Sequence, residues 1–87
     1  MQDHYSLLHT IYEIVKNDPQ PERYSCKPRE LILRRMQEWS DIQQQLQQLE
    51  KEGFVTTEQQ ETMVIRITNA GLSLVKEQLE VARLSGN

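Results

Sequence analysis

The apolar residues between positions 39 and 52 repeat with the period of an α-helix. Ile42, Leu46 and Leu49 are separated by four and three residues, so a helix places all three on one stripe. Gly53 follows this segment and can adopt the left-handed conformation that ends many helices. The pattern therefore predicts a helix over residues 40–52 with one buried face.

Ser40 and Gln43 indicate where this helix begins. They have the spacing of a capping box, in which two side chains bond backbone N–H groups of the first turn. We therefore expect Ser40 to cap the helix. Trp39, in the turn just before it, is expected to pack between this helix and the preceding one.

After Gly53 the pattern changes to that of a β-hairpin. The runs Phe54–Glu58 and Thr62–Thr68 favour extended structure, and a polar tip of three residues joins them. Every second residue of the later run is large and apolar, which indicates a strand with one buried face. Thr68 and Asn69 can then cap a last helix over residues 69–82.

The first third of the chain predicts two more helices. Asp3 can cap a helix over Asp3–Asn17, which the proline-containing segment 18–21 ends. Arg23–Cys26 is interpreted as a short third strand beside the hairpin. Pro28 suits the first turn of a helix that extends to about Gln37.

Several helices carry more apolar residues than one narrow stripe holds. In the second helix these residues are Leu31, Ile32, Leu33 and Met36, so we expect this helix to be contacted on two sides. The first and last helices also have a surplus, which favours a two-fold homodimer built from them. The alternative is that the surplus belongs to the core of the monomer.

The runs LQQLEKEGFV and RITNAGLSLV resemble the signature of winged helix-turn-helix regulators of the MarR and PadR type. The matching residues are Leu46, Leu49, Glu50, Gly53, Phe54, Ile67, Thr68 and Gly71. The resemblance covers about residues 28–76. It implies an α+β, mostly helical fold with a three-helix core, a β-wing hairpin and a C-terminal helix, in which residues 40–52 form the recognition helix.

Length and composition agree with one folded domain over residues 1–87. A chain of 87 residues buries only about 60–65% of its unfolded surface, so burial against a second subunit would add stability. A lone cysteine, Cys26, cannot form an internal disulfide, which fits a reducing compartment. Because no apolar run approaches 18 residues and the N-terminus lacks a signal-peptide pattern, we expect a cytoplasmic protein without membrane contact.

The polar face of the predicted recognition helix is rich in glutamine. Glutamine can bond adenine through two hydrogen bonds in the major groove, and serine can bond phosphate or base. Asp41 and Gln45 are expected to flank this face. The alternative is an ordinary solvent-exposed helix face. The DNA-contact candidates on this helix are Ser40, Gln44, Gln47, Gln48 and Lys51.

The positive charge that DNA phosphates require is concentrated in one part of the chain. The net charge is −3, residues 40–52 carry −2, and the hairpin tip adds Glu58 and Glu61. Phosphate contacts need lysine or arginine, and residues 27–38 carry +2. Intramolecular pairing, for example of Glu30 with Arg34, is the alternative use of these groups. The phosphate-contact candidates are Lys27, Arg29, Arg34, Arg35 and Arg66.

Patterns typical of other chemistry are weak. His4 and His9 are five residues apart and Cys26 is distant, so the sequence predicts no metal site, and no phosphate-binding loop or nucleophile arrangement is recognisable. We therefore expect no enzyme and no cofactor. The preferred hypothesis is a small dimeric transcriptional regulator that binds double-stranded DNA. The alternative is a winged-helix module for protein–protein interaction, which the acidic hairpin and the net charge favour.

Overall fold

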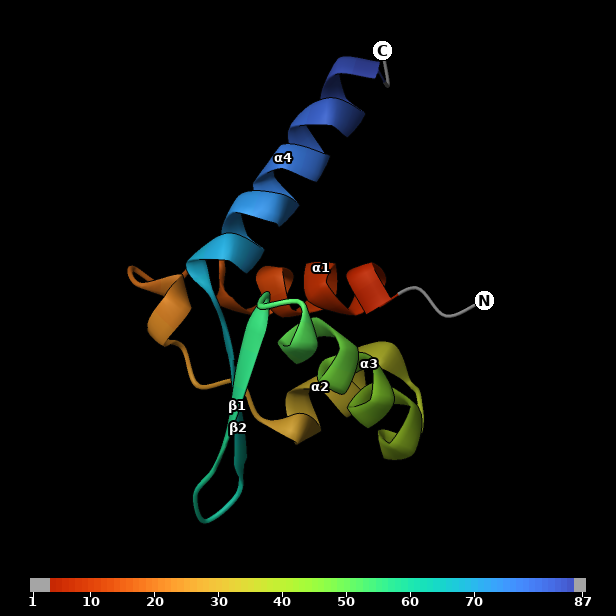
Figure 1. The fold of residues 1–87 in the computed structure, drawn as a ribbon, viewed down its shortest axis with the longest axis vertical. Coiled ribbons are helices and arrows are strands. Elements are labelled where there is room, and N and C mark those ends of the chain that lie inside the picture. Colours follow the sequence, from red (N-terminus) through yellow and green to blue (C-terminus); the bar gives the residue numbers. More distant parts are fainter. Residues whose placement is uncertain (1–3, 86–87) are drawn as a thin grey trace.

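The computed structural model describes residues 4–85, with side chains described up to residue 83, and has the α+β layout of a winged helix (Figure 1). Helices α1, α2 and α3 pack together, a two-stranded antiparallel hairpin lies beside them, and α4 extends away from this body. The elements are α1 (His4–Val15), a single 3₁₀ turn η1 (Pro21–Arg23), α2 (Pro28–Arg35), α3 (Trp39–Lys51), β1 (Val55–Gln59), β2 (Met63–Ile67) and α4 (Asn69–Ser85).

The core forms where α1 lies against α3 and the inner face of the hairpin. Each fully buried aliphatic side chain contributes about 1.5–3 kcal/mol through removal of apolar surface from water. The buried stripe of α3 is the predicted one, with Ile42, Leu46 and Leu49 at most 2% exposed. The other large buried aliphatic residues are Leu7, Leu8, Ile11, Val15, Leu31, Val55, Val64, Ile65, Ile67, Leu72 and Val75.

Helix α3 begins one residue earlier than the sequence pattern indicates, and the predicted Ser40 cap is wrong. Glu38 is the extended N-cap residue, and its carbonyl oxygen accepts the N–H groups of Asp41 and Ile42 at 3.1 and 3.2 Å. Ser40 therefore lies within the first helical turn. Trp39 packs against the core as expected, and this packing places it in the helix instead of in the turn before it.

The end of α3 is a Schellman motif around Gly53, as the glycine predicted. Gly53 has φ +85°, its N–H donates to Glu50 O at 3.0 Å, and the N–H of Phe54 donates to Leu49 O at 2.9 Å. These bonds satisfy two carbonyl groups that the helix end would otherwise leave unpaired. They also turn the chain sharply into β1.

Thr68 joins this helix end to the start of α4. Its hydroxyl donates to Gly53 O at 2.7 Å and accepts the N–H of Gly71 at 3.0 Å, so it caps α4 as predicted. Its own N–H donates to Phe54 O at 3.0 Å. Gly71 is required at this close approach, because a Cβ atom there would lie 2.3 Å from Phe54 O and 2.8 Å from Ile67 Cγ1.

The hairpin pairs Val55 with Ile67 and Gln59 with Met63. Ile65 and Ile67 are buried as the alternation predicts, but Val64, on the other face of β2, is buried as well. The predicted third strand at Arg23–Cys26 is reduced to one bridge. Cys26 exchanges two backbone hydrogen bonds with Ile65, at 2.8 and 2.9 Å, whereas η1 occupies the residues before it. Pro21 at the start of η1 favours this tight turn over an extended strand.

Helix α2 is shorter and more exposed than expected. Pro28 is its first residue, as predicted, but the helix ends at Arg35 because Met36 adopts the left-handed conformation with φ +56°. Only Leu31 is buried, and Ile32, Leu33 and Met36 are 37%, 66% and 86% exposed. The expected contact on two sides is therefore absent within the described chain.

The terminal helices agree with their predicted positions. Helix α1 ends at Val15, and the proposed cap Asp3 lies outside the described residues. Helix α4 buries Leu72 and Val75 at its base, whereas Leu79, which continues the same stripe, is 42% exposed where the helix leaves the body (Figure 1). None of the helices in the described part of the chain combines the length and apolar character that crossing a bilayer requires.

The close approach at Gly71 gives a stability prediction. Gly71→Ala should lower the free energy of unfolding by about 1–3 kcal/mol, because the new methyl group must push the Phe54 carbonyl away. Urea unfolding followed by circular dichroism measures the change. Ser73→Ala, on the exposed side of the same turn, is the control and should change the value by less than about 0.5 kcal/mol. Equal effects of the two substitutions would contradict the packing argument.

Candidate nucleic-acid interface

The outer surface of α3 presents the predicted polar row. Ser40, Gln44, Gln47 and Lys51 follow one another at intervals of three or four residues, and all four are exposed. Gln48 is also exposed, and its Nε2 donates to Glu52 Oε2 at 2.7 Å, which holds the amide against the flank of the helix. Side chains of Gln44, Gln47, Gln48, Glu50 and Lys51 line a shallow hollow along this surface.

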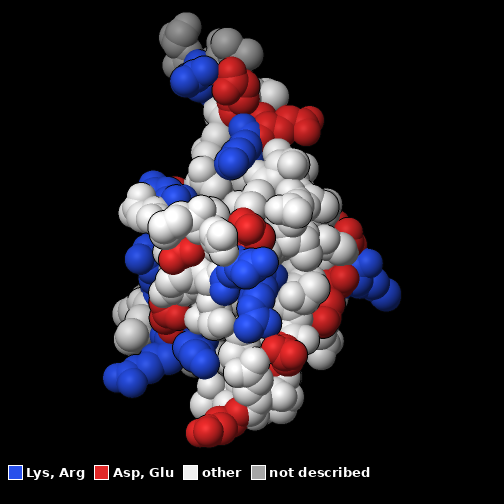
Figure 2. Space-filling view, turned by 90° about the vertical axis from the view of Figure 1, so that its left-hand side faces the viewer, with Lys and Arg blue, Asp and Glu red and all other residues white. Residues whose placement is uncertain are grey.

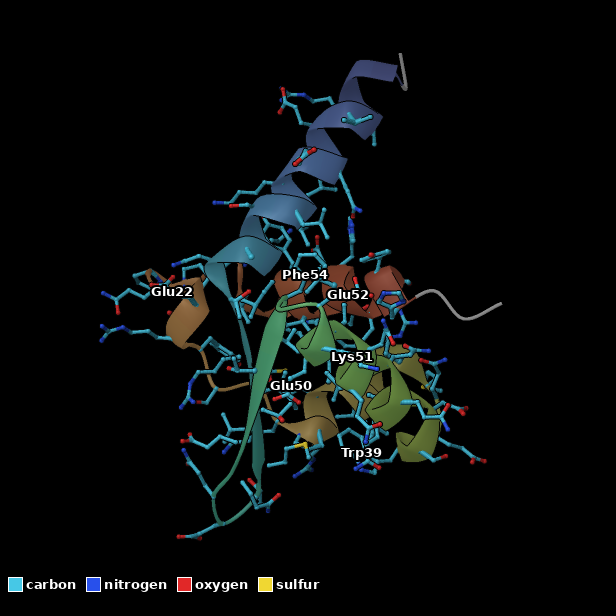
Figure 3. The ribbon with its side chains drawn as sticks, in the orientation of Figure 1. Glu22, Trp39, Glu50, Lys51, Glu52 and Phe54 are labelled. Atoms are coloured by element: carbon cyan, nitrogen blue, oxygen red, sulfur yellow. The ribbon has the colours of Figure 1, made fainter. Side chains whose placement is uncertain are left out.

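Two of the three carboxylates of this segment are turned toward the flanks of α3, and Figure 3 shows Glu50 toward β1 and Glu52 toward α1. Glu50 accepts hydrogen bonds from Thr57 on β1, from its backbone N–H at 3.3 Å and from its hydroxyl at 3.1 Å. The third carboxylate, Asp41, lies in the first turn, where the helix dipole favours negative charge.

Glu52 fastens the end of α3 to the beginning of α1. Its carboxylate accepts hydrogen bonds from the Tyr5 hydroxyl at 2.8 Å and lies 2.9 Å from Nε2 of His4. The hydrogen bond from Gln48, and then those from Tyr5 and His4, hold the pKa of the Glu52 carboxyl below its ordinary value of 4.5. The net −2 of residues 40–52 is therefore distributed around α3 and is not concentrated on its outer row.

The basic residues of α2 divide into exposed and engaged groups. Lys27, Arg29 and Arg34 are exposed. Arg35 lies between α1 and α2, where its guanidinium donates to Ser6 Oγ at 2.8 Å and to Thr10 Oγ1 at 3.1 Å. Arg35 therefore positions the two helices, and the exposed positive charge of α2 comes from the other three residues.

Glu30 does not pair with Arg34 in the described structure. Its carboxylate accepts the Tyr24 hydroxyl at 2.9 Å and the N–H of Lys27 at 3.0 Å, both at the start of α2. The hydrogen bond to Glu30 is also the main reason why the pKa of Tyr24 is raised above 10.0. Arg34 thus keeps its charge available on the surface.

The hairpin offers little positive charge. Arg66 donates to Glu58 Oε1 at 3.1 Å and to Ser25 Oγ at 3.3 Å, so it bridges β2, β1 and the segment before α2. The Gln60 side chain and then Arg66 hold the pKa of Glu58 below 4.5, so this carboxylate is ionised at neutral pH. In Figure 2 basic and acidic side chains are interspersed over the face that carries the hairpin, and the hairpin tip at the bottom is acidic.

Gln45 is the polar residue of α3 that sequence reasoning placed wrongly. It was expected beside the outer face, but it is only 4% exposed, and its Oε1 has no hydrogen-bond partner among the described residues. The signal was present in the sequence, because position 45 is three residues after Ile42 and four before Leu49. Gln45 therefore belongs to the buried stripe of α3 and does not flank its exposed polar face.

The cysteine and histidine side chains have structural surroundings. Cys26 is buried beneath the hairpin, and burial raises the pKa of its thiol to about 12, so the unreactive protonated form prevails at neutral pH. His4 contacts Glu52, whereas His9 contacts Gln78 of α4 at 2.6 Å between Nε2 and Oε1. The two histidines therefore join α1 to different parts of the fold, His4 to the end of α3 and His9 to α4.

Comparison with known proteins gives no relative from which a function can be transferred. No protein-family model matches the chain, and no curated protein matches it. The candidate interface is therefore judged on its own geometry. Its main features are the polar row of α3, the exposed cations of α2 and the acidic tip of the hairpin.

The Glu52 contacts predict a pH-dependent difference in stability. Because the pKa of Glu52 is lowered in the folded protein, its stabilising effect is complete above pH 4.5 and is lost as the pH falls through the folded-state value. Glu52→Gln should therefore unfold at lower urea concentration than the wild type near neutral pH, and the difference should shrink below pH 4.5. Glu61→Gln at the exposed hairpin tip is the control, with little difference at any pH. A pH-independent Glu52→Gln effect would contradict the assignment.

Proposed function

We propose that this protein is a small dimeric transcriptional regulator that binds double-stranded DNA in the cytoplasm. In this proposal α3 enters the major groove as the recognition helix, in the manner of the MarR and PadR type regulators that the sequence resembles. The observation that carries the proposal is the exposed row Ser40, Gln44, Gln47 and Lys51 on a helix whose opposite face is fixed in the core.

The chemistry of this row suits base edges. Glutamine amides both donate and accept, as adenine requires, and Lys51 can approach guanine acceptors or phosphate. Glu52 is held at the flank by Tyr5 and His4, whereas Glu50, which accepts hydrogen bonds from Thr57, also lines the hollow beside the row. The row itself contains no carboxylate.

Phosphate contact is assigned to the helix that precedes the recognition helix. In helix-turn-helix proteins this helix crosses the DNA backbone. Lys27, Arg29 and Arg34 are the exposed cations available there, whereas Arg35 and Arg66 support the fold and the hairpin through their hydrogen bonds. A dimer would present two copies of this set, one from each subunit, although each chain as a whole carries a net charge of −3.

The proposed dimer uses α4 together with α1. The distal half of α4 projects beyond the body in Figure 1, and a hollow lined by Tyr12, Lys76, Leu79, Glu80 and Arg83 lies where α4 leaves α1. Leu79 continues the buried stripe of Leu72 and Val75 into this exposed region. A second copy would cover it by a two-fold contact.

A second candidate function is protein–protein interaction through the winged helix. The acidic hairpin favours it, since Glu58 takes the hydrogen bond of Arg66 and the tip carries Glu61 without a neighbouring cation on the hairpin loop. A DNA-contacting hairpin would instead present lysine or arginine to phosphate.

DNA binding can be tested by fluorescence anisotropy with a random-sequence duplex over a range of salt concentrations. The wild type should bind with a steep negative salt dependence, and Arg29→Ala combined with Arg34→Ala should reduce the log–log slope by about 2, because two phosphate contacts are lost. Lys16→Ala combined with Arg23→Ala removes the same charge from exposed positions after α1 and in η1, which are not proposed contacts, and is the matched control.

Base reading is the second part of the same experiment. With a duplex enriched by selection on the wild type, Gln44→Ala should lose about 1–3 kcal/mol of binding free energy, and with the random duplex it should lose little. DNA binding that does not depend on salt concentration would exclude the proposed contacts. So would a control double variant whose DNA affinity falls as much as that of the α2 double variant.

The dimer predicts a change in mass. The wild type should elute as a dimer in size-exclusion chromatography with light scattering, and Leu79→Glu should shift it to a monomer because a charge would be buried between two α4 helices. Leu33→Glu, at a still more exposed apolar position on α2, is the control and should stay dimeric. A monomeric wild type at high concentration would end this part of the proposal.

A further inference from the structure

Helix α2 carries an apolar stripe that the described chain leaves uncovered. The stripe consists of Ile32, Leu33 and Met36, of which Leu33 and Met36 are 66% and 86% exposed. Ile32 and Leu33 lie in the last turn of α2, and Met36 is the residue that directly follows the helix. The left-handed conformation of Met36, at φ +56°, ends the helix and presents this long flexible side chain at its tip.

The stripe is continuous with a hollow at the start of the same helix. Lys27, Pro28, Arg29 and Thr62 line this hollow, which has a volume of about 390 Å³ and is walled mostly by carbon atoms. Arg29 lies four residues before Leu33 and therefore connects the hollow to the α2 stripe. A ligand that lay along α2 could place one side chain in the hollow and others on the stripe.

The charges around the α2 stripe determine what can cover it. Arg29, one turn before Leu33, and Arg34, next to Leu33 in the sequence, are exposed, and no ion pair joins either of them to another residue that the structure describes. Glu30, the carboxylate within α2, is held by Tyr24 and Lys27. An apolar surface between unpaired cations is complementary to an apolar segment that carries carboxylates.

A second copy of this chain is a poor occupant for the same reason. A two-fold contact through the α2 stripe would bring Arg29 and Arg34 of both subunits into one interface, where they would outnumber Glu38, the exposed carboxylate that follows Met36. Burying like charges together in this way is unfavourable. The α2 stripe also lies at the opposite end of the body from the distal half of α4 in Figure 1.

We infer that the α2 stripe and its adjoining hollow bind an acidic, amphipathic helical segment of a partner protein. The segment would lay apolar residues, spaced three or four apart, on Leu33 and Met36 and place aspartate or glutamate beside Arg29 and Arg34. Because the same arginines are the proposed phosphate contacts, partner and DNA would compete for them. The peptide-binding surface itself does not depend on DNA binding.

The test is a selection of 14-residue peptides displayed on phage. The library is first depleted on the Leu33→Ser/Met36→Ser variant and then selected on the wild type. Enriched peptides should combine apolar residues at helical spacing with a net negative charge. Synthesised with a fluorophore, they should bind the wild type at least ten-fold more tightly than this variant and than Arg29→Glu/Arg34→Glu, as measured by anisotropy. Both variants change exposed side chains and should keep the wild-type unfolding transition.

Controls separate this inference from the proposed function. Leu79→Glu, on α4, should bind the peptides as the wild type does, and Leu33→Ser/Met36→Ser should keep wild-type DNA binding, since neither side chain is a proposed DNA contact. No enrichment above the depleted variant, enrichment of neutral or basic peptides, or equal binding to the charge-reversed variant would each overturn the inference. So would a wild-type oligomer that Leu33→Ser/Met36→Ser dissociates, which would assign the stripe to a second copy.

Discussion

The arrangement of the winged helix depends on the hydrogen bonds that meet at Thr68. This residue follows β2 and caps α4, and its hydroxyl and N–H bind the carbonyl groups of Gly53 and Phe54, which end α3. Gly71 allows the backbone segments to approach, because any larger residue would collide with Phe54. The angle between α3, the hairpin and α4 is therefore fixed by backbone groups within one turn. The hydrogen bonds of Thr68 that hold the start of α4 therefore also orient the polar row of α3.

Charge disposition, more than total charge, decides what α3 can approach. The chain carries −3, yet the flanks of α3 use Glu50 and Glu52 as structural acceptors for the hairpin and for α1. Arg35 and Arg66 are likewise engaged in hydrogen bonds within the protein. Arg35 joins α1 to α2, and Arg66 joins the two hairpin strands. Few exposed cations remain near α3, so small changes on α2 should have large effects on any anionic partner.

The fold followed closely from local sequence signals, and the departures have clear causes. The periodic stripe of α3, the helix end at Gly53, the hairpin and the Thr68 cap depend on neighbours within a few residues, and the structure confirms them. The Ser40 cap was wrong because the N-cap is Glu38, two residues earlier, whose carbonyl oxygen accepts the first N–H groups of the helix. The engagement of Arg35 by Ser6 and Thr10 joins residues 25 or more positions apart, so no local pattern could predict it. The burial of Gln45 could have been predicted from its spacing to Ile42 and Leu49, but its polar side chain suggested an exposed position.

The two exposed apolar surfaces lie on different helices, one on α4 and the other on α2. The distal half of α4 and the stripe on α2 lie at opposite ends of the body, with the core between them (Figure 1). Symmetry suits α4, because two identical helices can cover each other there and no set of like charges opposes it. Symmetry does not suit α2, because its apolar residues are bordered by Arg29 and Arg34. A chain of this size that exposes both surfaces is therefore better explained by two different occupants than by one large dimer contact.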